Sequence, residues 1–166
     1  GDDTIIVFSS DHGTHLGENG YFQKTPALLN SAVAQLPLII RHPDRAFAGT
    51  QIDALVSSVD FMPTFLDMLN IEDQPELDGF NIWDLVTGDK ETLRERVYSQ
   101  FGKFAAVRDM DWHYFQPQEA DTPGKGAHLY NLREDPEETT NVAQDHSDVV
   151  ETMRAHLQSR LGMGLP

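Results

Sequence analysis

The chain of 166 residues contains no cysteine, so it holds neither a disulfide bond nor a thiolate ligand for a metal. Basic residues are also scarce. The 12 Lys and Arg stand against 27 Asp and Glu, which gives a formal net charge of −15. We therefore expect no nucleic-acid partner, because nucleic-acid binding needs a basic surface. No apolar run has the length that crosses a bilayer, so we also expect no membrane span.

The composition is otherwise that of a folded protein. A hydrophobic content of 39% with interspersed charge is typical of globular domains. The first apolar run, residues 5–8, is rich in β-branched side chains and predicts a strand buried on both faces, as in a parallel sheet. Few further candidates for parallel strands follow. We therefore expect this chain to be the C-terminal part of a longer protein.

Polar side chains that suit a metal follow directly after this strand. Asp11 offers carboxylate oxygen and His12 offers imidazole nitrogen, a pair that suits a divalent cation. Ligands of open α/β sheets bind beyond the carboxyl ends of the strands, which is where these two residues fall. Their spacing alone leaves an ordinary polar loop as the alternative.

The rest of the same stretch suits a bound anion. Gly13, Gly17 and Gly20 allow the loop to turn with positive φ or to pass close to a ligand. Lys24 adds a mobile cation, with a solvated lysine as the alternative. His15 lies on this loop as a candidate substrate contact or a solvated side chain.

The segment SDHGTHLGENG at residues 10–20, followed by Lys24, resembles the Asp-His-Gly-x-x-Leu-Gly-Glu-x-Gly signature of the sulfatases, a family of the alkaline phosphatase superfamily. Further blocks that are similar to the family follow in the same order across nearly the whole chain: residues 36–41, 59–64, 77–80 and 128–142. The order of these blocks is more specific than any one of them. The chain is similar to the C-terminal portion of a sulfatase of the Asp-His-Gly subtype.

This resemblance implies an α/β fold of the alkaline-phosphatase-like, sulfatase type. Residues 1–90 would form the C-terminal part of the catalytic α/β domain and its sheet. Residues 91–166 would form a C-terminal subdomain with a small antiparallel sheet and a final helix.

The resemblance also implies a function, that of a sulfuric ester hydrolase acting on a small sulfate ester or a saccharide. Asp11 and His12 would be metal ligands, most often of Ca²⁺ in this family, and Lys24 would be a catalytic residue that contacts the sulfate. The family nucleophile is a formylglycine made from a C/S-x-P-S-R motif, which this chain lacks. We therefore expect the nucleophile in an N-terminal part of the full-length protein, and we expect this chain alone to be inactive. Family members are often periplasmic, secreted or lysosomal, but these residues define neither compartment nor oligomeric state.

Two other functions remain open. A phosphonate monoester hydrolase or phosphodiesterase of the same superfamily shares the Asp-His pair. A truncated, non-catalytic binding module would explain the missing nucleophile motif, although such a module has no use for Asp11, His12 and Lys24.

Local patterns predict the elements between these motifs. The acidic run at residues 134–138 predicts a solvated turn, and Tyr130 is expected in the core. Trp112 and Tyr114 are expected to pack beneath the final helix, whose apolar face covers one side of the sheet. We expect helices at residues 26–34, 60–69, 82–86 and 148–161, and strands at residues 36–40, 52–58, 96–100, 104–108, 112–115 and 128–131.

Overall fold

The computed structural model describes residues 2–23, 29–43, 45, 47–73, 75–117 and 126–162. They belong to two compact units, each built from two separate stretches of chain. Unit 1 consists of Gly1–Val7 with Ile40–Val97, and unit 2 consists of Phe8–Ile39 with Tyr98–Pro166. The division of the chain at residue 90 stays a prediction. In the part of the chain that the structure describes, no helix combines the length and the apolar character needed to span a membrane.

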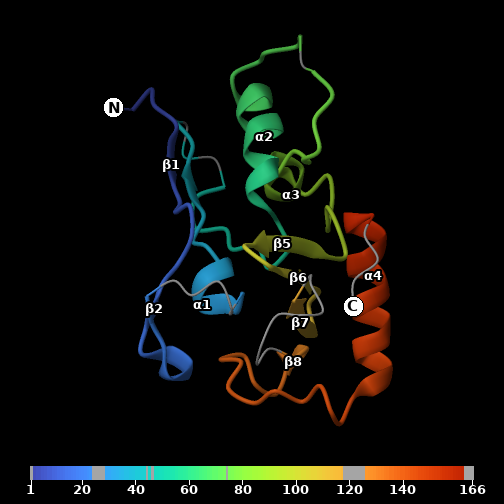
Figure 1. The fold of residues 1–166 in the computed structure, drawn as a ribbon. Helices are drawn as coiled ribbons and strands as arrows, with labels where there is room; N and C mark the ends of the chain where they lie inside the picture. Colours follow the sequence, from blue (N-terminus) through green and yellow to red (C-terminus); the bar gives the residue numbers. More distant parts are fainter. Residues whose placement is uncertain are drawn as a thin grey trace. The chain divides into compact units, whose positions relative to one another are not determined.

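A four-stranded sheet with the strand order β5-β6-β7-β8 lies at the centre of unit 2 (Figure 1). Strands β6 and β7 pair antiparallel, as do β7 and β8, so that Tyr114 lies opposite both Val107 and Leu129. The predicted small antiparallel sheet is confirmed. Its strands are β5 (Val97–Phe101), β6 (Phe104–Arg108), β7 (Trp112–Pro117) and β8 (His128–Asn131).

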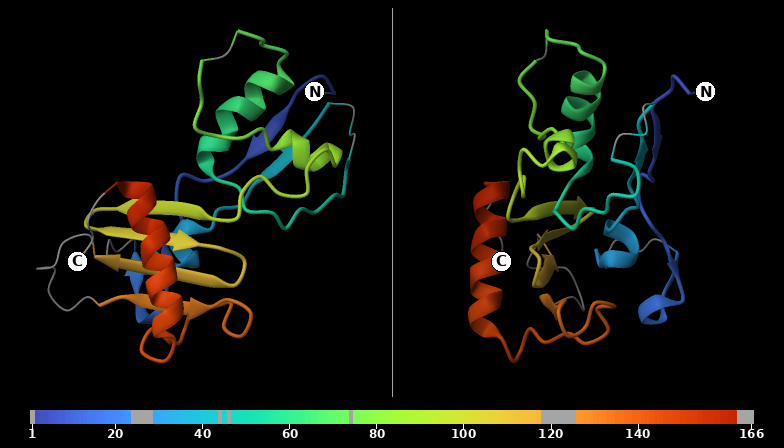
Figure 2. Two further views of the ribbon diagram at one scale, coloured as in Figure 1. Left: turned by 90° about the vertical axis from the view of Figure 1, so that its right-hand side faces the viewer. Right: turned by 180° about the vertical axis from the view of Figure 1, so that it is seen from behind.

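Helix α4 (Ser147–Leu161) covers one face of this sheet, as the left view of Figure 2 shows. Met153 and Leu157 point from α4 into the sheet and are 2% and 0% exposed. Alternate strand residues face the helix because successive side chains of a strand point to opposite sides. The final amphipathic helix and the packing of Trp112 and Tyr114 beneath it are thereby confirmed. The buried cluster consists of Ala105, Val107, Tyr114, Leu129, Met153 and Leu157.

The opposite face of the sheet packs against Leu29, just before helix α1 (Ser31–Ala34). The strand residues that alternate with the first set form this second buried cluster, which includes the predicted core residue Tyr130: Leu29, Phe104, Ala106, Phe115 and Tyr130. The predicted helix over residues 26–34 is longer than α1. The helix begins only at Ser31 because Asn30 has an extended backbone, with φ −68° and ψ 174°. Residues 24–28 lie outside the described residues.

Strands β1 (Ile6–Phe8) and β4 (Ile39–Arg41) form a two-stranded sheet. The predicted burial of the first strand is not found within this chain, because Ile6 and Phe8 are 52% and 59% exposed. The reason is that the described residues supply this strand with a single neighbour. The predicted strand at residues 52–58 is wrong, since this segment is irregular. At its end, the Ser57 N–H donates to a carboxylate oxygen of Asp60 at 2.7 Å instead of joining a sheet.

Among its described residues, unit 1 contains the α-helices α2 (Phe61–Met68), which follows the 3₁₀ turn η2 (Ser58–Asp60), and α3 (Trp83–Thr87). Both predicted helices are confirmed, and α3 ends at Gly88 with a φ of 84°. Thr64 joins them, because its hydroxyl accepts the Ile82 N–H at 2.9 Å. The fully buried Asp60 accepts hydrogen bonds from the Phe80 N–H and from the guanidinium of Arg94. These bonds fix the loops around both helices.

Candidate functional site

Asp11 and His12 lie on the exposed loop that follows β1. The His12 N–H donates to Asp11 Oδ1 at 2.9 Å, and His12 Nε2 lies 3.5 Å from Asp11 Oδ2. The hydrogen bond from the His12 backbone and the adjacent imidazole lower the pKa of Asp11, so its carboxylate is ionised at neutral pH. The structure therefore brings together the oxygen and the nitrogen that the sequence predicts as a metal-binding pair.

The second ring nitrogen of His12 fixes the orientation of its imidazole. Nδ1 lies 2.8 Å from the carbonyl oxygen of Gly13, which can only accept, so this hydrogen bond places the proton on Nδ1. Nε2 is then the ring nitrogen that is left for a metal, an arrangement typical of metal-bound histidines. The donor atoms of Asp11 and His12 thus fit two positions around a divalent cation. No group of three or more potential ligand side chains is found among the described residues, so the metal-binding role of the pair stays a prediction.

Gly13 attaches this loop to α1. Its N–H donates to the Val33 carbonyl at 2.9 Å. A Cβ atom on Gly13 would lie 2.0 Å from the carbonyl oxygen of Ala32. Glycine is therefore required here for close approach to the α1 backbone. Gly17 and Gly20 adopt positive φ values of 132° and 76°, as predicted.

His15 is fully buried, so the interpretation as a solvated side chain is wrong. It opens β2 (His15–Leu16), which pairs antiparallel with β3 (Phe22–Gln23) across the 3₁₀ turn η1 (Glu18–Gly20). Neither ring nitrogen of His15 has a hydrogen-bond partner among the described residues. Its contact with substrate stays a prediction. Lys24, the other predicted contact, lies outside the described residues, and its role also stays a prediction.

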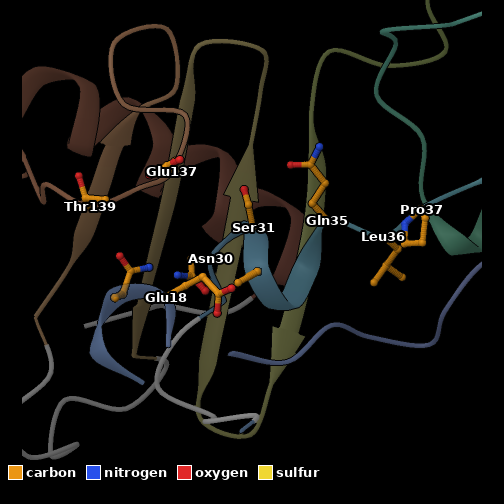
Figure 3. A pocket seen from close by; sticks show the side chains of 10 residues that line it. Glu18, Asn30, Ser31, Gln35, Leu36, Pro37, Glu137 and Thr139 are labelled. Atoms are coloured by element: carbon orange, nitrogen blue, oxygen red, sulfur yellow. The ribbon is translucent and has the colours of Figure 1, made fainter. Parts of the chain in front are cut away.

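Within unit 2, a groove of about 600 Å³ is bounded by η1, by α1 and the segment after it, and by the turn that follows β8 (Figure 3). Glu18 and Glu137 are the two acidic residues of its lining, which includes no lysine or arginine among the described residues. This lining suits hydroxyl or amino groups of a ligand better than an anionic group. The lining residues are Glu18, Asn19, Asn30, Ser31, Ala32, Gln35, Leu36, Pro37, Glu137 and Thr139.

A buried polar cluster that no sequence pattern predicts is centred on Glu138. The solvated turn predicted for residues 134–138 is wrong at this position, because Glu138 is 1% exposed. Its carboxylate accepts hydrogen bonds from Ser31 and lies 2.9 Å from His113 Nδ1 and 3.5 Å from Arg108 Nη1. Ser31 is 107 residues away along the chain, so no local pattern could reveal this contact.

The fold places the chain among the sulfatase-like hydrolases of the alkaline phosphatase superfamily. It matches, with a TM-score of 0.80 and 25% identity, a protein solved in complex with its substrate D-glucosamine-2-N,6-O-disulfate. This match covers 96% of the present chain and 34% of the other. The phosphonate monoester hydrolase of Agrobacterium radiobacter matches with a TM-score of 0.77 and 27% identity, over 95% of this chain and 35% of the other.

Within this class, the chain belongs to the family described as N-sulphoglucosamine sulphohydrolase, C-terminal, whose family model matches residues 17–163. It is 31% identical over 154 residues to the N-acetylglucosamine-6-O-sulfatase of Bacteroides thetaiotaomicron, covering 85% of this chain and 26% of the relative. It is also 31% identical over 155 residues to the choline-sulfatase of Rhizobium meliloti, covering 87% and 28%. The chain thus spans between a quarter and a third of the length of these relatives. The predicted membership of the sulfatases and the correspondence to their C-terminal region are confirmed.

Proposed function

We propose that the full-length protein is a sulfatase of the Asp-His-Gly subtype that hydrolyses a sulfate ester on a saccharide. The family match over residues 17–163 carries this proposal. The saccharide is supported by two similar proteins, an N-acetylglucosamine-6-O-sulfatase and a protein whose bound substrate is a sulfated glucosamine.

In this proposal, Asp11 and His12 are two ligands of a divalent metal, Ca²⁺ by resemblance to the family. A bound cation of this kind holds a sulfate oxygen and neutralises negative charge in the transition state. Asp11 contributes an ionised carboxylate, and His12 contributes an Nε2 whose orientation the Gly13 carbonyl fixes. The remaining ligands and the formylglycine nucleophile belong to parts of the full-length protein outside this chain.

Lys24 is the proposed catalytic contact to the sulfate group, because a flexible ammonium group can follow negative charge as it moves to the leaving oxygen. His15 is a second candidate for substrate contact. Its two ring nitrogens have no hydrogen-bond partner among the described residues, but the ring is fully buried, so a contact with substrate requires this loop to rearrange.

A second candidate function is the hydrolysis of phosphonate monoesters or phosphodiesters. The similarity to the phosphonate monoester hydrolase, at 27% identity, is of the same order as the similarity to the sulfated-glucosamine binder, at 25%. Sulfate and phosphonate esters both present tetrahedral anionic centres, which the same metal and lysine would hold. A non-catalytic module is the third alternative, supported by the absence of a nucleophile motif from these residues.

The test is the activity of the full-length protein, produced together with a formylglycine-generating enzyme. The substrates are glucosamine 6-sulfate, an aryl sulfate and the matched aryl phosphonate monoester. We expect turnover of the sulfates, and a loss of about 100-fold or more in kcat for Asp11→Ala and Lys24→Ala. The matched control is Asp53→Ala, because Asp53 is exposed and lies far along the chain from the loop.

Turnover of the phosphonate alone would instead support the second candidate function, the hydrolysis of phosphonate monoesters or phosphodiesters. Full activity in Asp11→Ala would remove Asp11 from the metal site. An absence of turnover with any of the three substrates, in a protein that carries formylglycine and binds no Ca²⁺, would favour the non-catalytic module.

A further inference from the structure

Glu138 is a buried acid on a strained backbone. Its side chain is 1% exposed, and its φ of 56° is unusual for a residue with a Cβ atom. Its carboxylate is ionised, because the hydrogen bond from His113 and the bonds from Ser31 lower its pKa more than burial raises it. Arg108, 3.5 Å away, balances its charge. A buried charge on a strained residue persists only where the surrounding contacts fix it in place.

The main contact of Glu138 outside the sheet is the first residue of α1. The Ser31 N–H donates to Oε2 at 2.8 Å and the Ser31 hydroxyl donates to Oε1 at 2.5 Å. Arg108 Nη1 lies 2.5 Å from the same hydroxyl oxygen. Helix α1 has only four residues and cannot hold its own position, since short helices depend on tertiary contacts. Glu138 and Arg108 therefore attach the start of α1 to the sheet.

Helix α1 in turn holds the loop of the metal pair. The Gly13 N–H donates to the Val33 carbonyl at 2.9 Å, and Gly13 lies against the Ala32 carbonyl without room for a Cβ atom. Gly13 directly follows His12, and its carbonyl orients the His12 imidazole. A displacement of α1 thus moves the residue that determines where His12 Nε2 points.

We propose that Glu138 is a positioning residue for Asp11 and His12, acting through Ser31 and α1. This inference rests on the proposed function only in one respect, the identity of the ligand that Asp11 and His12 bind, which is Ca²⁺ in that proposal. The mechanical part, that Glu138 holds the loop at residues 9–16, stands independently of it. Glu138 touches neither substrate nor metal in this proposal.

The experiment compares Glu138→Gln with Glu134→Gln in the full-length protein. Glu134 lies in the same acidic run but is exposed, so it is the matched control. Two quantities are measured. One is the Ca²⁺ dissociation constant by calorimetric titration, and the other is hydrogen exchange in peptides covering residues 9–16 and, for comparison, residues 147–161 of α4, on the opposite face of the sheet. Glutamine keeps the size of the side chain and one acceptor oxygen, while it removes the charge.

We expect Glu138→Gln to weaken Ca²⁺ binding by about 10-fold, the lower end of the range for residues that orient metal ligands. We also expect faster exchange at residues 9–16 without a matching increase in α4 at residues 147–161. A general loss of stability would accelerate exchange in both segments. Ser31→Ala should give a smaller change in the same direction, and the double variant should show less than the sum of the two effects, because both act through one contact.

Unchanged exchange at residues 9–16 in a folded Glu138→Gln protein would overturn the proposal, as would an equal increase in both segments. If Glu138→Gln does not fold, Ser31→Ala decides by the same two measurements. If Asp11→Ala binds Ca²⁺ as tightly as the wild type, the proposed metal site fails. The exchange at residues 9–16 then still decides whether Glu138 positions the loop.

Discussion

Replacement of Gly13 by alanine tests how closely the loop of Asp11 and His12 must approach α1. The added Cβ would lie 2.0 Å from the Ala32 carbonyl oxygen, whereas ordinary contacts begin at 3.4 Å. The two backbones must therefore separate by 3.4 − 2.0 = 1.4 Å. Such a shift breaks the 2.9 Å hydrogen bond from Gly13 to Val33, at a cost of about 1 kcal/mol in stability. The larger effect concerns activity, because a displacement of roughly 1 Å in a catalytic group can cost about 100-fold.

The assay is sulfate-ester turnover and Ca²⁺ affinity of the full-length protein. Gly126→Ala is the matched control, because a Cβ atom at Gly126 meets no atom of the described residues within 4 Å and this residue has no positive φ. We expect a fall in kcat of about 100-fold and weaker Ca²⁺ binding in Gly13→Ala only. Wild-type kcat and Ca²⁺ affinity in Gly13→Ala would contradict this prediction, since they would show that the loop tolerates separation from α1.

Three further predictions concern stability. Asp60→Ala should cost about 3–5 kcal/mol, because it leaves the 13% exposed Arg94 without its buried partner, and thermal melting of the variant and the wild type measures this loss. Leu157→Ala should cost about 2–5 kcal/mol by opening a cavity beneath α4, whereas Leu161→Ala at the half-buried helix end should cost less in the same denaturant titration. Burial raises the pKa of Asp60 and Glu138, but their hydrogen bonds and charged partners lower it by more, below the ordinary values of 3.8 and 4.5. The unfolded chain therefore binds protons first as the pH falls, so this stabilisation is complete above about pH 4.5 and is lost at lower pH. Glu138→Gln should flatten the decline in melting temperature over that acidic range, and an unchanged decline would contradict the assignment.

The sheet of unit 2 is the part of the fold that the sequence predicts best. Alternating side chains and turn residues are local signals, and they locate β5 to β8 within one or two residues. The same alternation of side chains predicts a strand at residues 52–58, and this prediction is wrong. There the Ser57 N–H donates a hydrogen bond to the Asp60 carboxylate. A side chain that competes for a backbone group can override a weak strand pattern.

The candidate site likewise has one part that the sequence predicts and another part that it does not. Asp11 and His12 are adjacent in sequence, so their pairing follows from a local motif. The burial of His15 and Glu138 does not follow from a local motif, because it depends on residues that are distant in the sequence. His113 is 25 residues from Glu138, and Ser31 is 107 residues from it. Polar residues are expected at the surface by default, and only these distant partners reverse that expectation.

The contact between Ser31 and Glu138 also has a consequence for how the protein is made. The loop of Asp11 and His12 is synthesised more than a hundred residues before Glu138, and domains fold as their residues emerge. The support of this loop on α1 is therefore incomplete until Glu138 has been synthesised and has emerged. A premature stop codon shortly before Glu138 would spare every predicted metal and sulfate contact, yet the product would lack the anchor of α1. Truncations that remove Glu138 would then inactivate the protein at a distance from the residues that bind.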